Sequence, residues 1–527
     1  MNMIEQNMHG ALVLAEAVKA AYSRGQTDYS MEPLVRVDAA GKPVGAVRDG
    51  DAIIFCCRRG EREIELTEAF TEPDFAHFER QRLDLLDFVI MTLYHEKFYN
   101  LPVAFAPAKV SGTLGEVVSQ AGLSQLRCAE SEKYAHITFF LNGGRSEPFP
   151  AEAGVRVPSP KGIPFDQVPG LSLPQVADEV IKGIQGSYRL IATNFANGDV
   201  IGHTSNEQAK IECAEIVDQH LKRVVTAALT KDMIVIITAD HGNLEVMRTE
   251  SGTPHVAHTT NPVPFIVIEP RFSGDLDAED GSLSDLAPTI LPMLELQPSP
   301  EMTGKNLLNG HHWGSHRRVL LIILDGWGFG KRDETNPIHL AHTPFWDDLC
   351  ARYAPANLAA SGEAVGLQAG KPGNSEAGHM NIGAGRVVLQ DDVRLEQALQ
   401  DGSFSKNPVF VDTIAKVKAQ GSALHLIGLL TEKSSHGSID YPLALLQLAK
   451  QHNLSQVYLH LIFDGRSTEP GSAPLLLEKL EQRMQEIGLG QVATGIGRGL
   501  ALDRDGNYGK VQKAYDAMVN GIGQAAF

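Results

Sequence analysis

Several apolar runs of strand length in this sequence stop abruptly at an acid, an asparagine or a glycine. The run VLLIILDGWG (319–328), for example, ends at Asp325 and Gly326. The other runs of this kind are HITFFLNGG (136–144), RLIATNFANGD (189–199), DMIVIITADHGN (232–243), LHLIGLL (424–430) and VYLHLIFDG (457–465). Amphipathic stretches with helical spacing, such as 11–25, lie between these runs. Buried strands that alternate with helices predict an α/β fold with a mainly parallel sheet.

Chain length and charge limit the organisation and the partners. A chain of 527 residues is too long for one ordinary core, so two domains are expected. The net charge of −18 argues against a nucleic-acid partner or an anionic membrane surface, because both require basic protein surface. A small anionic substrate remains compatible, since a few arginines and lysines can converge in one cleft.

The cysteine pattern and the N-terminus predict a cytoplasmic protein. The five cysteines include no CxxC pair, which favours free thiols in a reducing compartment over a disulfide framework. We see no basic segment followed by a hydrophobic one at the N-terminus, and so expect no signal peptide. No apolar run approaches the roughly 20 residues that a membrane-spanning helix needs.

Acids and histidines gather where the predicted strands end. In open α/β sheets, ligands bind at the carboxyl ends of the strands. The residues of this kind are Asp199, His203, Asp240, His241, His255, His258 and Asp325. Mixed Asp and His ligands suit Mn²⁺, Zn²⁺ or similar ions rather than Ca²⁺, and this many ligands favour two ions over one.

Each of these residues also has an ordinary structural interpretation. An aspartate at the end of a strand is often only a turn former, and a D-x-x-x-H pair such as Asp199 and His203 is often a surface ion pair. A lone histidine is usually a hydrogen-bonded polar group. The complete set is far more specific than any one member.

The segment KPGNSEAGHMNIGAGR (371–386) adds a candidate nucleophile. Pro372 and Gly373 break any preceding element, so a helix is expected to begin at Asn374 or Ser375. A serine at a helix N-terminus beside a metal ion is well placed to attack phosphorus, because the helix amides favour phosphate oxygens. The alternative is that Ser375 is only an N-cap, with Glu376 and His379 solvated.

Six segments together resemble the cofactor-independent phosphoglycerate mutases of the alkaline phosphatase superfamily. They are LLIILDGWG, GNSEAGHMNIGAGR, EKYAHITFFLNGG, NGDVIGHT, TADHGN and AHTTNPVPF. The resemblance covers nearly the whole chain. It implies two domains, one with an alkaline-phosphatase-like, mainly parallel sheet flanked by helices and one α/β domain that binds substrate. It also implies a monomer that interconverts 2- and 3-phosphoglycerate through a phosphoserine with two Mn²⁺ ions (Co²⁺ or Zn²⁺ as alternatives) and no organic cofactor.

The resemblance also assigns roles to individual residues. One metal would be held by Asp199, His203 and His258. The other would be held by Asp325, Ser375, Asp240 and His241, with Ser375 as the nucleophile and His436 in proton transfer. The residues expected to bind substrate are Arg59, Arg62, Lys133, Arg466, Ser467, Arg498 and Arg504. Guanidinium forks suit phosphate and carboxylate oxygens.

The order of the motifs differs from that of the family. Family members begin with the DGWG strand and end near a segment like EMTGKNLL, which here precedes that strand at 301–308. A circular permutation explains this order, with the family's usual termini joined through an exposed connector at 309–318. The metal-binding phosphatase domain is then expected at 108–389, and the substrate-binding domain at 1–107 and 390–527. Permutation is tolerated at exposed sites when the original termini lie close together.

Three departures affect the predicted substrate-binding domain. The family's GRDT is GRST here, so that Ser467 replaces an aspartate, and two further segments are altered to CRRGER and TEKSSH.

The leading hypothesis for the function of the protein is a mutase. A phosphatase or phosphomutase of the same superfamily that acts on another small phosphate ester is the first alternative. A metal-binding protein without catalytic function is the second.

Overall fold

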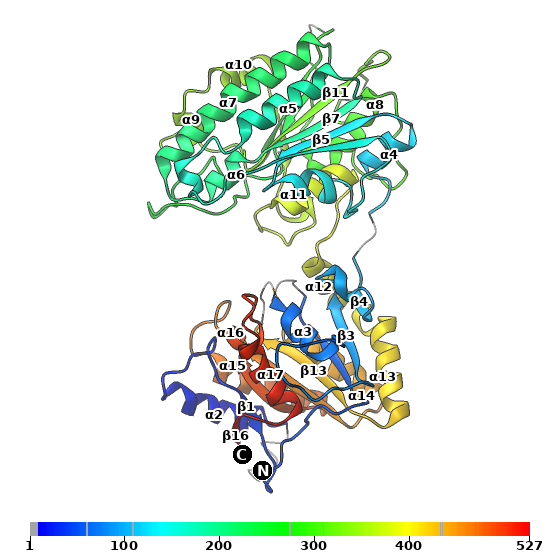
Figure 1. Ribbon diagram of the computed structural model, residues 1–527, viewed down its shortest axis with the longest axis vertical. Helices are drawn as coiled ribbons and strands as arrows, with labels where there is room; N and C mark the ends of the chain where they lie inside the picture. Colours follow the sequence, from blue (N-terminus) through cyan, green and yellow to red (C-terminus); the bar gives the residue numbers. More distant parts are fainter. Residues whose placement is uncertain are drawn as a thin grey trace. The chain divides into compact units, whose positions relative to one another are not determined.

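The computed structural model describes residues 9–58, 62–107, 110–272, 276–308, 310–432, 434 and 436–527. The chain divides into two compact units, and in each of them helices cover a sheet (Figure 1). The terminal unit comprises Met1–Pro107 and Arg394–Phe527, and the central unit comprises Ala108–Val393. Both units are α/β, so the predicted fold class is confirmed. None of the helices in the described ranges is long and apolar enough to cross a membrane.

The central unit is built on an eight-stranded sheet in the order β10-β12-β9-β8-β11-β7-β5-β6. Its strands are β5 (Gln125–Glu130), β6 (Glu152–Val157), β7 (Leu190–Phe195), β8 (Ile234–Thr238), β9 (Val263–Ile268), β10 (Gly281–Ser282), β11 (Val319–Leu324) and β12 (Ala356–Ala359). The five strands from β8 to β6 are parallel, and β9 runs antiparallel to both β8 and β12. Every residue of β11 is buried, which fits its unbroken apolar run.

Helices cover this sheet and connect its strands. They are α4 (Leu114–Gln120), α5 (Leu173–Gln185), α6 (Asn197–Gly202), α7 (Glu207–Thr230), α8 (Leu286–Met293), α9 (Pro337–Leu340), α10 (Pro344–Tyr353) and α11 (Ser375–Ala384). In Figure 1, α5 and α7 run side by side over the strands β5, β7 and β11. Helix α12 (Asp391–Asp401) spans the boundary between the two units.

One expected strand is a helix. The run at 136–144 forms the short helix η3 (His136–Phe140) instead of a strand. Ile137 and Leu141 are buried, whereas the three residues between them are only half-buried. That spacing of four residues buries one face of a helix, and it does not fit the alternation of a half-buried strand.

The terminal unit contains a second eight-stranded sheet, in the order β16-β1-β15-β14-β13-β2-β3-β4. Its strands are β1 (Leu34–Arg36), β2 (Ala52–Phe55), β3 (Asp87–Thr92), β4 (Val103–Phe105), β13 (Leu424–Leu430), β14 (Val457–Phe463), β15 (Gln491–Gly497) and β16 (Gln524–Ala526). Strands from the two ends of the chain are neighbours here, since β2 pairs with β13 and β1 pairs with both β15 and β16. The N-terminal and C-terminal segments therefore form one sheet.

Helices pack on both faces of this sheet. They are α2 (Ala11–Tyr22), α3 (Ile64–Thr71), α13 (Pro408–Gln420), α14 (Asp440–Gln451), α15 (Ala473–Ile487), α16 (Arg498–Ala501) and α17 (Tyr508–Val519). Two hydrophobic cores result. In β2, Ile54 belongs to the core with α2, α14 and α15, while Ile53 and Phe55 belong to the core with α3 and α17. This period of two is that of a strand buried on both faces.

The connector at 309–318, expected to be exposed, is exposed only in part. His312 and His316 are exposed, but Trp313 is only 7% exposed and belongs to the hydrophobic core of the central unit. The ring of His311 lies 4.4 Å from Trp313 and 4.8 Å from Phe272, measured between centroids. Burial of a large aromatic ring is favourable, so Trp313 packs against the core although it lies in a short connector. Asn309 lies outside the described residues.

Candidate functional site

Three adjacent parallel strands bring the predicted acids to one edge of the central sheet. Asp325 follows β11, Asp240 and His241 follow β8, and Asp199 lies in α6 just after β7. Because β7, β11 and β8 are neighbours and parallel, their carboxyl ends meet. Asp240, His241 and Asp325 have no exposed surface. The strand-end acids are therefore neither turn formers at the surface nor solvated.

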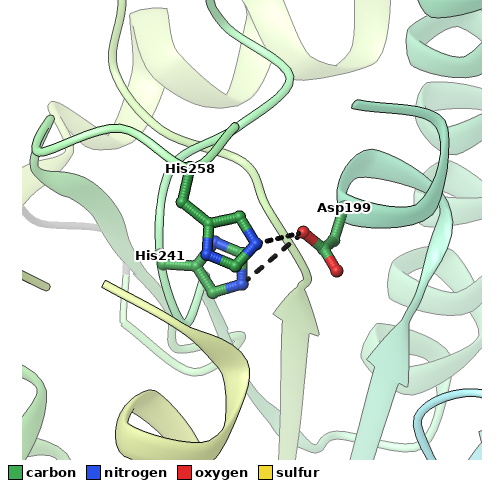
Figure 2. A group of neighbouring side chains, drawn as sticks. All are labelled: Asp199, His241 and His258. Carbon is green, nitrogen blue, oxygen red and sulfur yellow. Dashed lines mark ion pairs between the residues drawn. The ribbon is translucent and has the colours of Figure 1, made fainter. Parts of the chain in front are cut away.

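A first group of possible metal ligands comprises Asp199, His241 and His258 (Figure 2). The Nε2 atom of His258 lies 3.0 Å from Asp199 Oδ1, and Nε2 of His241 lies 3.8 Å from the same oxygen. His203 joins them, with its Nε2 atom 3.2 Å from Asp199 Oδ1 and 3.0 Å from His258 Nε2. Asp199 and His203 are one turn of α6 apart, so their side chains lie on the same side of the helix, as their spacing in the sequence predicts.

In each of these three histidines, a hydrogen bond at Nδ1 determines that Nε2 is the ring nitrogen that faces Asp199. The Nδ1 atoms of His203, His258 and His241 lie near the carbonyl oxygens of Val256 (2.9 Å), Gly373 (2.8 Å) and Gly242 (3.2 Å). A carbonyl oxygen only accepts, so each Nδ1 carries the hydrogen and donates it. In the neutral rings, all three Nε2 lone pairs then converge on Asp199, which is the arrangement that metal-ligating histidines show.

A second group comprises Asp240, His241 and Asp325. The Nε2 atom of His241 lies 3.6 Å from Asp240 Oδ2 and 3.6 Å from Asp325 Oδ1. The hydroxyl oxygen of Ser375 lies beside this group, 3.0 Å from His241 Nε2 and 3.2 Å from Asp325 Oδ1. His241 is common to both groups, so the two sets of ligands are contiguous.

Lys133 links the two groups to the serine. Its ammonium nitrogen lies 2.6 Å from Asp199 Oδ2, 2.8 Å from Asp325 Oδ1 and 2.7 Å from Ser375 Oγ. Burial opposes the charge, but Asp325, Asp199 and Asp240 outweigh it and raise the pKa of Lys133 above its usual value. Without a bound metal ion the lysine is therefore a cation, and the serine has a charged donor at hydrogen-bond distance.

The donors at this edge fit divalent cations. Three buried carboxylates face a single ammonium, so the cluster has an excess of negative charge that a cation would balance. The Oδ2 atom of Asp240 is buried and receives no hydrogen bond from the described part of the chain. His379 Nδ1 is 3.3 Å away, but it donates to the carbonyl oxygen of Ser375 at 2.8 Å. A buried carboxylate oxygen without a donor is the position that a metal ligand occupies.

The local structure around Ser375 excludes the N-cap interpretation. Asn374 is the N-cap of α11, because its Oδ1 atom accepts a hydrogen bond from the amide of Ala377 at 2.8 Å. Ser375 is the first residue of the helix, and its hydroxyl points instead to Lys133 and His241. Glu376 is exposed as that interpretation expected, but His379 is fully buried.

Glu245 holds the loops that carry the ligands, and the motif analysis did not identify it. Its Oε2 atom accepts hydrogen bonds from the amides of Asn243 (2.8 Å) and Gly328 (3.1 Å). Its Oε1 atom accepts from Thr259 Oγ1 and from Asn261 Nδ2 at 2.9 Å. The fully buried carboxylate thus joins the three loops that contain His241, Asp325 and His258. Its place four residues after His241, in DHGNLE, was the available signal.

Asn194 and His379 are two more buried residues near the serine whose part in the site the sequence motifs did not indicate. The Nδ2 atom of Asn194, within β7, donates to Asp325 Oδ2 at 2.6 Å and lies 3.0 Å from His379 Nε2. Since His379 carries its hydrogen on Nδ1, its Nε2 accepts from Asn194. An asparagine inside the apolar run LIATNF was the sequence signal for Asn194.

His255, one of the predicted candidate ligands, lies outside both ligand groups, and its carbonyl oxygen accepts a hydrogen bond from the ammonium of Lys210 at 2.7 Å.

The terminal unit gathers some of the predicted substrate residues at the carboxyl ends of its strands. Arg498 follows β15 and is buried, with Nη1 2.5 Å from Asp464 Oδ1 at the end of β14. Arg62 is buried and donates to the carbonyl oxygen of Leu502 at 2.9 Å. His436 is buried, with Nδ1 3.1 Å from Glu63 Oε1. Arg498 also interacts electrostatically with Glu63, so the two ion pairs lie near one another.

The remaining predicted substrate residues are distributed differently. Arg466, Ser467 and Arg504 are exposed. Lys133 belongs to the central unit and contacts the ligand groups there. Arg59 lies outside the described residues. The structure thus brings together, within the terminal unit, a buried subset of the predicted residues and leaves three at its surface.

Comparisons with known proteins agree with this arrangement of residues. The family model of the metalloenzyme superfamily matches residues 12–298. The model of the N-terminal domain of 2,3-bisphosphoglycerate-independent phosphoglycerate mutases matches residues 395–527. An N-terminal domain thus matches the C-terminal end of this chain.

Individual relatives bear the same family name. The 2,3-bisphosphoglycerate-independent phosphoglycerate mutase of Moorella thermoacetica is 45% identical over 57% of this chain and 58% of its own length. That of Syntrophotalea carbinolica is 46% identical over 56% of this chain and 57% of its own length. The chain therefore spans somewhat more than half the length of these relatives. A solved Leishmania mexicana phosphoglycerate mutase is 31% identical over 45% of this chain and 46% of its own, with a TM-score of 0.36 that is too low to bear on the fold.

The metalloenzyme model covers more than half of the chain, and possible metal ligands occur together at one edge of the central sheet. The chain belongs to the metalloenzyme superfamily, and its C-terminal end matches the model of the N-terminal domain of the 2,3-bisphosphoglycerate-independent phosphoglycerate mutases.

Proposed function

We propose that this protein interconverts 2-phosphoglycerate and 3-phosphoglycerate through a phosphoserine on Ser375. The observation that carries the proposal is the placement of the Ser375 hydroxyl, within 3.2 Å of Lys133, His241 and Asp325 at the first residue of α11. The names of the relatives support the choice of substrate. In this proposal the central unit carries the phosphoryl group and the terminal unit binds the substrate.

We propose two divalent cations as cofactors, with Mn²⁺ first and Co²⁺ or Zn²⁺ as alternatives. One would be held by Asp199, His203 and His258, and the other by Asp240, His241, Asp325 and Ser375. The convergent Nε2 lone pairs and the unpartnered Asp240 oxygen support these assignments. Bound divalent cations polarise a phosphoryl group and lower the pKa of a coordinated hydroxyl.

The residues of the chain itself then have defined tasks. The hydroxyl of Ser375 would lose its proton to solvent, because a bound cation would lower its pKa. Its Oγ atom attacks the phosphorus and a new O–P bond forms, while the old O–P bond breaks and the ester oxygen of the substrate leaves and takes up a proton from water. The first-turn amides of α11 lie beside Ser375 and favour phosphoryl oxygens. The Nζ atom of Lys133 lies 2.7 Å from the serine oxygen, so it can donate a hydrogen bond there, where negative charge develops. Arg62 and Arg498 are proposed to bind substrate oxygens through their guanidinium groups.

The second step transfers the phosphoryl group from Ser375 to the other hydroxyl of glycerate, and here this chain has a weakness. Ser467 cannot act as a base near neutral pH without an activating partner, and it is exposed. Asp464, three residues earlier, is held by Arg498 at 2.5 Å, which reduces its availability as a substitute. We therefore propose a slow mutase in which water competes for the phosphoryl group, so that some turnovers release free phosphate. This keeps the phosphatase activity as the second candidate function.

One time course distinguishes the candidates. The full-length protein is loaded with Mn²⁺ and given 3-phosphoglycerate, and ³¹P NMR follows 2-phosphoglycerate and inorganic phosphate together. A mutase produces 2-phosphoglycerate faster than phosphate, whereas a phosphatase produces phosphate without the isomer. Absence of both products, with Mn²⁺ bound, contradicts the proposed function and favours a non-catalytic metal-binding protein.

A further inference from the structure

The buried strand β7 carries an asparagine whose side chain reaches a proposed metal ligand. Asn194 has no exposed surface, and its Nδ2 atom donates to Asp325 Oδ2 at 2.6 Å. We infer that Asn194 is a positioning residue, which holds the carboxylate of Asp325 so that the other oxygen, Oδ1, serves the second cation and Ser375. The inference rests on the proposed function and deepens it.

Strand pairing fixes the positions of the two residues. Asn194 lies opposite Ile323 in the parallel pair of β7 and β11, and Asp325 follows two residues later. The amide of Asp325 also donates to the carbonyl oxygen of Phe195 at 3.1 Å. Strands hold the side chains of a site more precisely than loops do, so the sheet itself determines the distance between the amide and the carboxylate.

The two oxygens of Asp325 have different partners. Oδ2 faces Asn194, whereas Oδ1 lies 2.8 Å from Lys133 Nζ, 3.2 Å from Ser375 Oγ and 3.6 Å from His241 Nε2. The bond from Asn194 resists rotation of the carboxylate, because rotation would take Oδ2 away from its donor. Hydrogen-bond partners of this kind orient the ligands of metal sites. Oδ1 is therefore the oxygen that faces Ser375 and can bind a cation beside it.

His379 fixes the direction of the Asn194 amide and ties it to the helix that begins at Ser375. Its Nδ1 atom donates to the carbonyl oxygen of Ser375 at 2.8 Å, so its Nε2 atom accepts from Asn194 Nδ2 at 3.0 Å. The reversed amide would place its oxygen against two acceptors, His379 Nε2 and Asp325 Oδ2. A chain of three hydrogen bonds thus connects the first residue of α11 to Asp325.

Asn194 is an unfavourable choice for the stability of this strand. All six residues of β7 are buried, and the Oδ1 atom of Asn194 has no hydrogen-bond partner in the described part of the chain. Burial of a polar atom without a partner costs free energy that an apolar side chain of similar size would not. The two hydrogen bonds from Nδ2 are what the asparagine supplies, and both lead to the proposed site.

The first test measures Mn²⁺ binding, which requires no turnover. The full-length protein with His203→Gln and His258→Gln loses two ligands of the first cation, so calorimetric titration reports the second. In this background Asn194→Leu should weaken Mn²⁺ binding by about 10- to 100-fold, the usual effect of removing a partner of a ligand. In an Asp325→Ala background, where the first cation is measured, it should change the affinity by less than about twofold, because it acts through Asp325. No loss in the first background, or an equal loss in both, would overturn the inference.

The matched control is Asn142→Leu in the first background. Asn142 is also buried in the central unit, and its Nδ2 atom also donates to a carboxylate, that of Glu152, at 2.9 Å. The variant therefore loses the same kind of bond away from both ligand groups, and its Mn²⁺ affinity should equal that of its parent. The same loss of Mn²⁺ affinity in Asn142→Leu as in Asn194→Leu would overturn the inference, because any buried amide would then have this effect.

Turnover gives a second readout in the otherwise wild-type protein. At saturating Mn²⁺, Asn194→Leu should lower kcat by about 10- to 100-fold, because Asp325 and Ser375 are no longer held together. KM for 3-phosphoglycerate should change little, since Asn194 is not proposed to touch the substrate, and a loss confined to KM would overturn the inference. If the wild-type protein does not isomerise phosphoglycerate, the proposed function fails, while the Mn²⁺ titrations still decide the role of Asn194.

A measurement on the wild-type protein does not depend on the folding of Asn194→Leu. The ¹⁵N chemical shifts of the His379 ring in the full-length, Zn²⁺-loaded protein, assigned by their absence from His379→Gln, report which nitrogen carries the hydrogen. Hydrogen on Nδ1 and a lone pair on Nε2 are the expected result. Hydrogen on Nε2 would overturn the inference, because Asn194 would then present its oxygen, and not its NH₂ group, to His379 and Asp325.

Discussion

The hydroxyl oxygen of Ser375 lies 2.7 Å from the ammonium nitrogen of Lys133, which also contacts Asp199 and Asp325. One cation thus serves both groups of possible metal ligands and the proposed nucleophile. All four side chains are buried, so the charges are poorly screened by water. We therefore propose a role for Lys133 in the chemistry, whereas the sequence motifs assigned it to substrate binding.

Lys133→Met should slow phosphoryl transfer without abolishing metal binding. Removal of a single charged donor to the reacting oxygens typically costs about 10² to 10³ in kcat. Metal affinity should be retained or increased, because the variant leaves the carboxylates of Asp199 and Asp325 without their ammonium partner. Steady-state kinetics and calorimetric titration with Mn²⁺ test both statements. A variant with wild-type kcat would show that Lys133 only neutralises charge.

Metal binding should weaken as the pH falls, beginning above the ordinary histidine pKa of about 6.5. A protonated His203 donates a hydrogen bond to Asp199, which raises the pKa of His203, and for His258 the same carboxylate outweighs the opposing effect of burial on its pKa. A ligand histidine must be neutral, so the ion has to displace a proton that the raised pKa retains to higher pH. Affinity should therefore fall by about tenfold per pH unit for each proton displaced.

The control for this prediction lies in the same loop. His258→Gln should weaken Mn²⁺ binding and flatten its pH dependence, whereas His255→Gln should change neither, because His255 lies outside both ligand groups. Titrations of both variants and the wild-type protein at pH 6 and pH 8 give the comparison. An Mn²⁺ affinity that is the same at both pH values would contradict the assignment of the histidines.

Glu130, the last residue of β5, should make the protein less stable as the pH rises. It is buried, and burial raises its pKa to about 7. The unfolded chain loses this proton near pH 4.3, while the folded protein retains it until about pH 7. Stability is therefore lost between these two pH values, by about 4 kcal/mol in total at about 1.36 kcal/mol per unit.

Glu130→Gln removes the titration and keeps an acceptor for the amide of Ser172, which donates to Glu130 Oε2 at 2.9 Å. The difference in the free energy of unfolding between variant and wild type should therefore grow in favour of the variant from pH 5 to pH 8.5. Urea denaturation of both proteins in the presence of a chelator measures it without a contribution from metal binding. A difference that does not depend on pH would show that Glu130 is ionised in the folded protein.

Ser467→Asp should increase the share of turnovers that end in isomerisation. A carboxylate at this exposed position at the end of β14 could accept a proton from bound glycerate, and a positioned base contributes about 10² to 10⁴ in rate. The ratio of 2-phosphoglycerate to free phosphate, measured by ³¹P NMR, should rise. An unchanged ratio would indicate that Ser467 lies away from the acceptor hydroxyl and would favour the phosphatase.

The sequence was sufficient for the fold class and for the ligand edge of the central sheet, because both depend on local patterns. Long apolar runs define β11 and β8, and their terminal Asp325 and Asp240 must then meet where adjacent parallel strands end. The assignments of ligands and nucleophile remain predictions, and the geometry agrees with them. The prediction of a strand at 136–144 was wrong because its apolar residues also fit one face of a helix. In so short a run, periodicity cannot distinguish a strand from a helix.

The supporting residues carried only weak signals in the sequence. Glu245 and Asn194 bind partners that are distant along the chain, such as Thr259 and Asp325. A polar residue in or beside an apolar run marks a candidate, but its partners are known only once the loops are placed. The same holds for Trp313, whose burial depends on Phe272 and the core rather than on the composition of the connector.

The central claim is that Ser375 carries the phosphoryl group, and a trapped intermediate tests it most directly. The Mn²⁺-loaded protein is mixed with 3-phosphoglycerate, quenched in acid within milliseconds, digested and examined by mass spectrometry. We predict phosphate on the peptide that contains Ser375, at a level that falls as substrate is exhausted, and none in Ser375→Ala, which should bind Mn²⁺ but not turn over. Phosphate on another residue, or turnover by Ser375→Ala near the wild-type rate, would contradict the account.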